Sequence, residues 1–398
     1  PFYRCQSVLN ARKSEISRKN YLLGTELRRK TLIRLDISSH RIAVIGEIVL
    51  SATMQNFMRN LFIYLLPMVV VLLSQTQQVM AGPALLFETA TGKVLYAEDP
   101  DHQWHPASLT KIMTAYIVFE EMKAGRLTAD SKLICTEEAA KMEPSKIGLP
   151  VGAKLRLEVA IKALIIKSAN DVSVMLAQKI SGSVPAFADR MNATAKRLGM
   201  TRTHFENPNG LPNKAQVTTA RDLAKLSRAI VRDFPQHAHY WSMPRFKIGK
   251  RSIGSHNNLL KTFAGADGLK TGFICDSGYN VVASATRDGR QLMAVILGEP
   301  TGRERGLRAS SLLEHGFQQY GWKTLFNSTS IDNMPIRADA APARSIRKTV
   351  RAWVCGWRAP VSAKTKRLRA AKRRRARLKK KRRLKAAARS KASKRSKK

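Results

Sequence analysis

The sequence predicts an α+β fold in which helices pack on one antiparallel sheet. Three observations predict it: a β-hairpin before residue 100, a mainly helical stretch over 108–232, and three strand-like runs after residue 268 that a helix follows. Of the 398 residues, 44% are apolar, which is ordinary for a globular protein and allows a sizeable buried core. We place this domain at residues 82–325.

Apolar periodicity and turn residues predict the elements of this domain in chain order. Apolar runs at 85–87 and 94–96 flank a turn that ends in Gly92, which predicts the hairpin. Helices are predicted over 108–123, 157–166, 171–180, 184–198 and 219–232, with Thr218 as the N-cap of the last. Strands are predicted over 268–274, 279–285 and 291–297, with a hairpin at Arg287-Asp288-Gly289-Arg290 and a closing helix over 307–320.

Residues 54–81 have the layout of a secretory signal peptide. Arg59 gives a charged start, residues 61–73 form a short apolar run, and Val79-Met80-Ala81 offers small residues for cleavage. The run is short for a membrane-spanning helix, which needs about 20 residues, although an uncleaved anchor is the competing interpretation. We expect an exported protein, periplasmic or associated with the cell envelope. Residues 1–53 are an unassigned leader that a mis-set translation start would explain.

Basic residues are concentrated at the C-terminal end of the chain. The net charge is +43, and residues 364–398 contain 21 Lys or Arg and no Asp or Glu. Such a block repels itself and is predicted to be a disordered tail. No aromatic residue interleaves it, so nucleic acid is an unlikely partner, and anionic envelope polymers or lipids are favoured. A non-enzymatic role as an electrostatic binding protein acting through this tail stays an alternative. The mixed residues 326–363 are predicted to be a linker.

Four cysteines, at positions 5, 135, 275 and 355, match no metal-binding spacing. We expect no metal or other cofactor, and at most one disulfide without a predicted pairing. Cys275 lies close to a motif described below, where a small buried apolar residue is favoured over a reactive thiol.

Ser108-Leu109-Thr110-Lys111 places a hydroxyl and an amine on one face of a predicted helix start. A serine becomes a nucleophile only when a neighbouring base takes its proton. Lys111 can do so if burial or a second cation lowers its pKa from the free value of about 10.4. Unpaired N–H groups at a helix start favour developing negative charge. Alone, however, this spacing is common in helices without a catalytic role.

Two further motifs follow in the sequence. Ser168-Ala169-Asn170 lies between predicted helices, where a hydroxyl can pass a proton and an amide can hold a peptide group, although a plain helix cap is the competing interpretation. Lys270-Thr271-Gly272 lies on a predicted strand, where glycine lets a peptide pair with the strand edge and the polar side chains can bind a carboxylate. A strand ending in a turn would also explain this motif.

The three motifs in this order are the signature of β-lactamases and penicillin-binding proteins. Residues 83–320 resemble the low-molecular-mass penicillin-binding D-alanyl-D-alanine carboxypeptidases. The strings that carry the resemblance are Pro106-Ala107-Ser108-Leu109-Thr110-Lys111, Lys167-Ser168-Ala169-Asn170-Asp171, Phe205-Glu206-Asn207-Pro208-Asn209-Gly210-Leu211 and Asp267-Gly268-Leu269-Lys270-Thr271-Gly272-Phe273. The resemblance implies a β-lactamase/transpeptidase-like fold with a helical subdomain.

The resemblance also implies roles for individual residues. Ser108 would form the acyl-enzyme, with Lys111 as proton acceptor and Ser168 as proton relay. The substrate-binding residues would be Asn170, Lys270, Thr271, Gly272, Phe273 and Arg305, with the N–H groups of Ser108 and Phe273 forming the oxyanion hole. The substrate would be a peptidoglycan pentapeptide that loses its terminal D-alanine, and β-lactam antibiotics would inhibit.

Two enzymes that use related residues remain as alternatives. A class A β-lactamase needs a glutamate to activate water, and Glu206 is the candidate by position. Its surroundings lack the Glu-x-x-Leu-Asn pattern of that class and fit the carboxypeptidase loop. An endopeptidase that cuts peptide cross-links would use the same residues as a carboxypeptidase.

Overall fold

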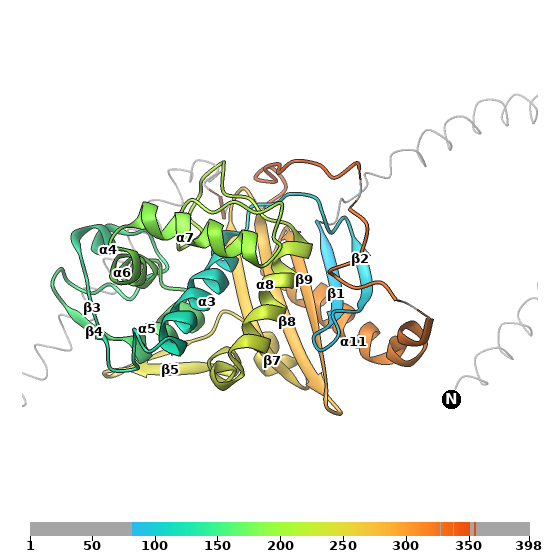
Figure 1. The fold of residues 1–398 in the computed structure, drawn as a ribbon, viewed down its shortest axis with the longest axis horizontal. Helices are drawn as coiled ribbons and strands as arrows, with labels where there is room; N and C mark the ends of the chain where they lie inside the picture. Colours follow the sequence, from blue (N-terminus) through green and yellow to red (C-terminus); the bar gives the residue numbers. More distant parts are fainter. Residues whose placement is uncertain (1–81, 327, 337, 351–353, 356–398) are drawn as a thin grey trace, which may run out of the picture. The chain divides into compact units, whose positions relative to one another are not determined.

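The computed structural model describes residues 82–326, 328–336, 338–350 and 354–355. The predictions for residues 1–53, 54–81 and 364–398 lie outside these ranges. Five strands form an antiparallel sheet in the order β2-β1-β9-β8-β7 (Figure 1). These strands are β1 (Ala84–Glu88), β2 (Val94–Glu98), β7 (Ala266–Ile274), β8 (Gly278–Arg287) and β9 (Arg290–Glu299). The predicted α+β class and the two predicted hairpins are confirmed.

Helices cover both faces of the sheet because its central strand is apolar on both sides. Along β9, Met293, Val295 and Leu297 belong to the core shared with helix α8 (Ala220–Asp233), while Leu292, Ala294 and Ile296 belong to a second core shared with α11 (Gly302–Phe326). This alternation is the period-two geometry of a strand. Figure 1 shows α8 and α11 on opposite faces of the sheet.

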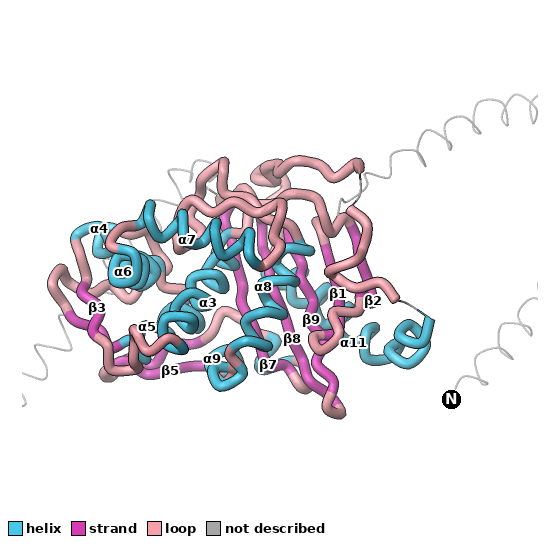
Figure 2. Tube along the Cα trace, viewed as in Figure 1, coloured by secondary structure: helices cyan, strands magenta, loops and turns pink. Residues whose placement is uncertain are grey.

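A helical region lies beyond the β7 edge of the sheet (Figure 2). Its buried centre is α3 (Thr110–Lys123), which is apolar on nearly every side. The other helices of the domain are α4 (Glu137–Lys141), α5 (Leu157–Lys162), α6 (Asn170–Ser181), α7 (Val184–Arg197), α9 (His239–Ser242) and α10 (Leu259–Thr262). Two small hairpins, which the sequence did not predict, pair β3 (Lys132–Ile134) with β4 (Lys154–Arg156) and β5 (Arg245–Ile248) with β6 (Arg251–Gly254).

Most boundaries differ from those predicted by one or more residues, and two of the differences have a clear physical cause. The N-cap of α8 is Thr219, whose hydroxyl accepts the Asp222 N–H at 3.0 Å, and the prediction of Thr218 was wrong. Thr218 instead exchanges backbone hydrogen bonds with Trp104, which holds it in an extended bridge. Helix α11 begins at Gly302, five residues before its predicted start, because the Thr301 hydroxyl accepts the Glu304 N–H.

The described residues after α11 pack on the domain, although the sequence predicts a linker there; we call residues 328–336, 338–350 and 354–355 the strap. Ile331 is 0% exposed and Val350 is 1% exposed. The buried Arg221 guanidinium, which is paired with Asp101, also donates to the carbonyl of Pro335 at 3.0 Å. Apolar residues this widely spaced give no periodic signal, which is why the sequence suggests a linker.

A disulfide joins Cys275 to Cys355 and so ties the strap to the end of β7. The expectation that Cys275 is a small buried apolar residue was wrong, since its side chain is only partly buried and its sulfur is bonded to a residue 80 positions away in the sequence. Cys135 is buried with a free thiol. Among the described residues, no helix has the length and apolar character needed to cross a membrane.

Candidate active site

Ser108 lies in a 3₁₀ turn, Ala107–Leu109, that leads directly into α3. Two other segments approach this turn closely. A Cβ on Gly210, whose φ is +81°, would lie 1.9 Å from the carbonyl oxygen of Ala107, and a Cβ on Gly272 would lie 3.1 Å from the backbone nitrogen of Ser108. Only glycine permits these approaches. The turn is thus clamped between the Asn207–Gly210 loop and strand β7.

The Lys111 side chain is 1% exposed, and its Nζ has three polar neighbours. It lies 3.1 Å from Ser108 Oγ, 2.8 Å from Asn170 Oδ1, and within hydrogen-bond distance of the Asn209 carbonyl. Asn170 Nδ2 donates to the carbonyl of Glu143, which fixes Oδ1 toward the lysine. Two of the three neighbours therefore only accept. A neutral amine, with two N–H donors, must then turn its lone pair toward the Ser108 hydroxyl.

The environment of Lys111 favours this neutral form. Burial and the positive charge of Lys270 hold the pKa of Lys111 well below its usual value, and only the Asp171 carboxylate opposes them. Asp171 is itself engaged by the N–H groups of Ile147 and Gly148 at 3.1 and 2.8 Å. This lowered pKa is the condition under which the sequence predicts that Lys111 acts as a general base.

Ser168 follows a π-helical turn, Ala163–Lys167, and stands just before α6. Its backbone is left-handed, with φ 59° and ψ 43°, which is uncommon for a residue with a side chain. Its Oγ is buried and has no hydrogen-bond partner among the described residues. Ser168 is the C-cap of the π-helical turn through its backbone N–H, which donates to the Ala163 carbonyl, so the cap interpretation holds for the backbone, whereas the hydroxyl caps no helix. This hydroxyl is available to a ligand.

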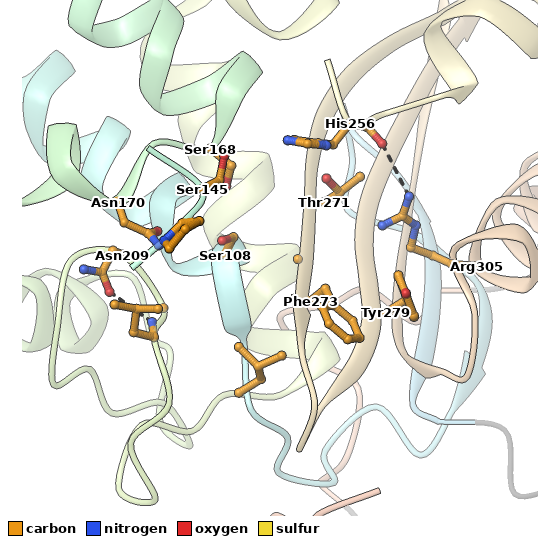
Figure 3. Close-up of a pocket in the computed structure, with 15 residues that line it drawn as sticks. Ser108, Ser145, Ser168, Asn170, Asn209, His256, Thr271, Phe273, Tyr279 and Arg305 are labelled. Atoms are coloured by element: carbon orange, nitrogen blue, oxygen red, sulfur yellow. Dashed lines mark hydrogen bonds between the residues drawn. The ribbon is translucent and has the colours of Figure 1, made fainter. Parts of the chain in front are cut away.

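Ser108, Ser168 and Asn170 line a cleft of about 370 Å³ whose opposite wall is β7. Figure 3 shows Ser168 and Asn170 on one side, Thr271 and Phe273 on the other, and Ser108 between them. The wall of the cleft includes Thr271, Gly272 and Phe273. Because β7 is an edge strand, backbone groups on its outer side are available to pair with a ligand.

Lys270 occupies a different place from its neighbours on β7. Its side chain is 2% exposed, and its ammonium donates to the Thr271 carbonyl at 2.9 Å instead of lining the cleft. Burial and the charge of Arg305 lower its pKa to about 7. The ammonium of Lys270 therefore affects the site mainly through its charge, because it lies outside the lining of the cleft.

Arg305 lies in the first turn of α11 and reaches the cleft. Its guanidinium donates to the carbonyl of His256 at 3.4 Å and lies over the Tyr279 ring at 5.9 Å. Burial lowers the pKa of Arg305 to about 10, and burial together with Lys270 lowers the pKa of the His256 imidazole to about 4. His256 is thus neutral at physiological pH, and Arg305 supplies the positive charge at this end of the cleft.

The structure brings every predicted site residue to this cleft or directly behind it. Sequence reasoning missed several residues that also line it, namely Pro144, Ser145, Leu211, His256, Ile274 and Tyr279. The strand register offered a signal for Tyr279, since it pairs with Phe273 across one hairpin. No local pattern marked the others. Among the described residues that line the cleft, there is no Asp or Glu.

A serine hydroxyl beside a buried amine, facing the free edge of an antiparallel sheet, defines the class of active-serine proteins with a β-lactamase/transpeptidase-like fold. The predicted fold class is confirmed by solved structures. The chain is 34% identical to penicillin binding protein 5 from Haemophilus influenzae, with a TM-score of 0.59, covering 61% of this chain and 72% of that one. It is 29% identical to penicillin-binding protein D2 from Listeria monocytogenes in its ampicillin-bound form, with a TM-score of 0.56, covering 61% and 99%.

The chain belongs to the peptidase S11 family, described as D-alanyl-D-alanine carboxypeptidase, whose model matches residues 71–301. It is 33% identical over 257 residues to the D-alanyl-D-alanine carboxypeptidase DacF of Bacillus subtilis, covering 62% of this chain and 64% of that protein. It is 35% identical over 255 residues to DacA of Haemophilus influenzae, covering 62% and 65%. The chain thus spans less than two thirds of the length of these relatives.

Proposed function

We propose that the protein is a serine-type D-alanyl-D-alanine carboxypeptidase that trims the terminal D-alanine from peptidoglycan stem peptides and that penicillin inhibits. The observation that carries the proposal is the buried amine of Lys111, which lies 3.1 Å from Ser108 Oγ and whose pKa burial and the charge of Lys270 hold well below its usual value. Membership of the family supports the substrate class.

We propose the following reaction for this site. Lys111 takes the proton of Ser108, and the Ser108 oxygen attacks the carbonyl carbon of the penultimate D-alanine while the N–H groups of Ser108 and Phe273 stabilise the oxyanion. The C–N bond breaks, and the leaving D-alanine amine receives a proton from Lys111. In this step the Ser168 hydroxyl, which has no hydrogen-bond partner among the described residues, would turn to bridge Lys111 and the leaving amine. Water then attacks the ester carbonyl, with Lys111 accepting a proton from the water. The bond between the acyl carbon and the Ser108 oxygen breaks, and Lys111 returns the proton to that oxygen, which regenerates the serine and releases the shortened peptide. Each step conserves charge with Lys111 alternating between amine and ammonium.

The terminal carboxylate of the substrate binds at the Thr271 end of the cleft. Thr271 supplies a hydroxyl, Arg305 a guanidinium, and Lys270 a positive charge behind the strand. Asn170, which holds Lys111, also faces the cleft and is positioned to bind the substrate's peptide group. A cationic site with no lining carboxylate selects an anionic ligand.

The absence of a lining carboxylate also bears on the β-lactamase alternative. Glu206 hydrogen-bonds to His204 at 2.8 Å and to Asn213 at 3.4 Å, away from the residues that line the cleft. It is not placed to activate water for rapid deacylation. Hydrolysis of cross-links by the same residues remains a second activity to be measured.

Incubation with penicillin, followed by mass spectrometry, tests the proposal. We expect one adduct, on Ser108, that persists for minutes, and release of D-alanine from a pentapeptide. Ser108→Ala should abolish both, whereas Ser131→Ala, an exposed-turn control, should change neither. An adduct on another residue, or wild-type protein that releases no D-alanine, would contradict the proposal. A dimeric cross-linked substrate in the same assay measures endopeptidase activity.

We further propose that the protein is exported to the periplasm or cell envelope by a cleaved signal peptide at residues 54–81. The Cys275–Cys355 disulfide supports an oxidising compartment. Cell fractionation should find the protein outside the cytoplasm, and deletion of residues 54–81 should retain it inside. We also propose that the basic tail, residues 364–398, binds anionic envelope polymers or lipids; its deletion should weaken envelope association at low salt, and unchanged association would refute this.

A further inference from the structure

A second cavity adjoins the active-site cleft along the direction of β7. It has a volume of about 470 Å³ and lies between the loop Pro212–Lys214 and the strap, which contributes Ala343 and Ser345. Ile274 lines both this cavity and the active-site cleft. The matched family region ends at residue 301, so the strap wall lies outside it.

The order of groups along β7 gives the direction in which a substrate would lie. The carboxylate end of the cleft is marked by Thr271, the oxyanion position by Phe273, and the second cavity by Ile274 and Asp276. Figure 3 shows Thr271 and Phe273 in this order along the strand. A peptide whose C-terminal carboxylate lies at Thr271 therefore runs antiparallel to β7 and carries its upstream residues toward the second cavity.

The distances along the chain fit a position close to the scissile bond. An extended chain advances roughly 3.3–3.6 Å per residue. Ile274, the last residue of β7, lies one residue beyond Phe273, and Asp276 lies in the turn that follows. The cavity therefore begins beside ligand residues about one position before the acylated one and continues past the end of the strand.

The charges of the cavity indicate what it binds. The Asp276 carboxylate is already occupied: Ser345 donates to it at 2.6 Å, and Arg347 donates at 3.0 and 3.2 Å and keeps its pKa below the usual value. It is therefore not available to a cationic ligand. Lys214 lines the cavity, is exposed, and has no ion-pair partner among the residues that the structure describes. Of these two charged side chains, the Lys214 ammonium is therefore the one that remains to bind a charged ligand.

We propose that this cavity is a second substrate subsite, in which Lys214 binds a carboxylate carried by the peptide two residues before the one that acylates Ser108. In a stem peptide this group is the free α-carboxylate of the γ-linked glutamate. The proposal rests on the proposed carboxypeptidase function, and it makes the strap a wall of the substrate groove.

Two peptides that differ in one charge test the subsite. One is L-alanyl-γ-D-glutamyl-L-lysyl-D-alanyl-D-alanine, and the other has the glutamate α-carboxylate converted to an amide. Lys214→Ala should lower kcat/KM for the acidic peptide about 3- to 5-fold, the range of an exposed ion pair, mainly through KM. It should leave the amide peptide and the rate of penicillin acylation unchanged. Lys132→Ala, which removes an exposed lysine from β3, is the matched control and should change neither.

Binding of the same peptides to the Ser108→Ala variant separates the subsite from turnover. The acidic peptide should bind about 3- to 5-fold more tightly than the amide, the difference should shrink with added salt, and Lys214→Ala should remove it. Equal binding of the two peptides, or an equal loss for both in Lys214→Ala, overturns the subsite. Wild-type protein that forms no penicillin adduct and releases no D-alanine instead overturns the proposed function, while the binding measurement still decides the subsite.

Discussion

Replacing Gly210 by alanine should impair the nucleophile through its backbone. The new Cβ would lie 1.9 Å from the Ala107 carbonyl oxygen and 2.9 Å from the Ser108 nitrogen, whereas ordinary contact begins at 3.4 Å. The loop and the serine turn must therefore separate by about 1.5 Å, the difference between 3.4 and 1.9 Å. Misplacement of reacting groups by about 1 Å can lower a rate about 100-fold, so we expect at least this loss in acylation.

Gly182→Ala is the matched control. Its φ of +79° is nearly that of Gly210 at +81°, but a Cβ there meets nothing within 4 Å. Both variants share the left-handed strain of about 1–2 kcal/mol, and only Gly210→Ala adds the clash. Second-order labelling by a fluorescent penicillin measures acylation, and thermal unfolding measures stability. If Gly210→Ala is acylated within about threefold of Gly182→Ala, the proposed clamping of the serine turn is refuted.

Three further predictions concern charge, proton transfer and the strap. Lys270→Gln removes the neighbouring cation, so the pKa of Lys111 should rise. The acidic limb of the pH–rate profile for acylation, where the rate falls as Lys111 gains a proton, should therefore move to higher pH. An acidic limb at the same pH as in the wild type would contradict this prediction. Ser168→Ala should slow acylation about 10²- to 10⁴-fold without lowering the melting temperature, because the lost hydroxyl is buried and unpaired; a large drop in melting temperature would show that the hydroxyl is structural. Replacing Cys275 and Cys355 together by serine should lower the free energy of unfolding by about 2–4 kcal/mol and abolish the effect of reductant in thermal unfolding; a reductant effect that persists would exclude the disulfide as its source.

The elements that the sequence predicted most accurately are those whose hydrophobic pattern agrees with their burial in the fold. Strand β9 is apolar from Leu292 to Leu297, and Asp288 and Gly289, which precede it, both have the positive φ that a two-residue hairpin needs. The motifs around Ser108 and Lys270 were predictable because chemistry restricts their residue types. The relation between Lys111 and the Asn209 carbonyl was not, since 98 residues separate them and a carbonyl leaves no trace in sequence.

Other features depend on tertiary contacts that no local pattern carries. His256 becomes a cleft residue through tertiary contacts such as the hydrogen bond that its carbonyl accepts from Arg305, 49 residues later. Strands of three residues, such as β3 and β4, are too short to show alternation. The strap is held by scattered contacts, such as those of Ile331, Val350 and Cys355, rather than by a repeated apolar face.

The order of strands in the sheet also determines when, during synthesis of the chain, the folded domain can form. The central strand, β9, is the last of the five in the chain, and the first strand pairs with it, with Ala84 opposite Ile296. Long-range pairing of this kind folds slowly, because the loop must close before any contact forms. The central strand is therefore missing from the sheet while the first two hundred residues of the domain are being synthesised. If the chain is exported, this delay keeps the polypeptide extended for transport. The turn that holds Ser108 then forms only after β9 has crossed the membrane.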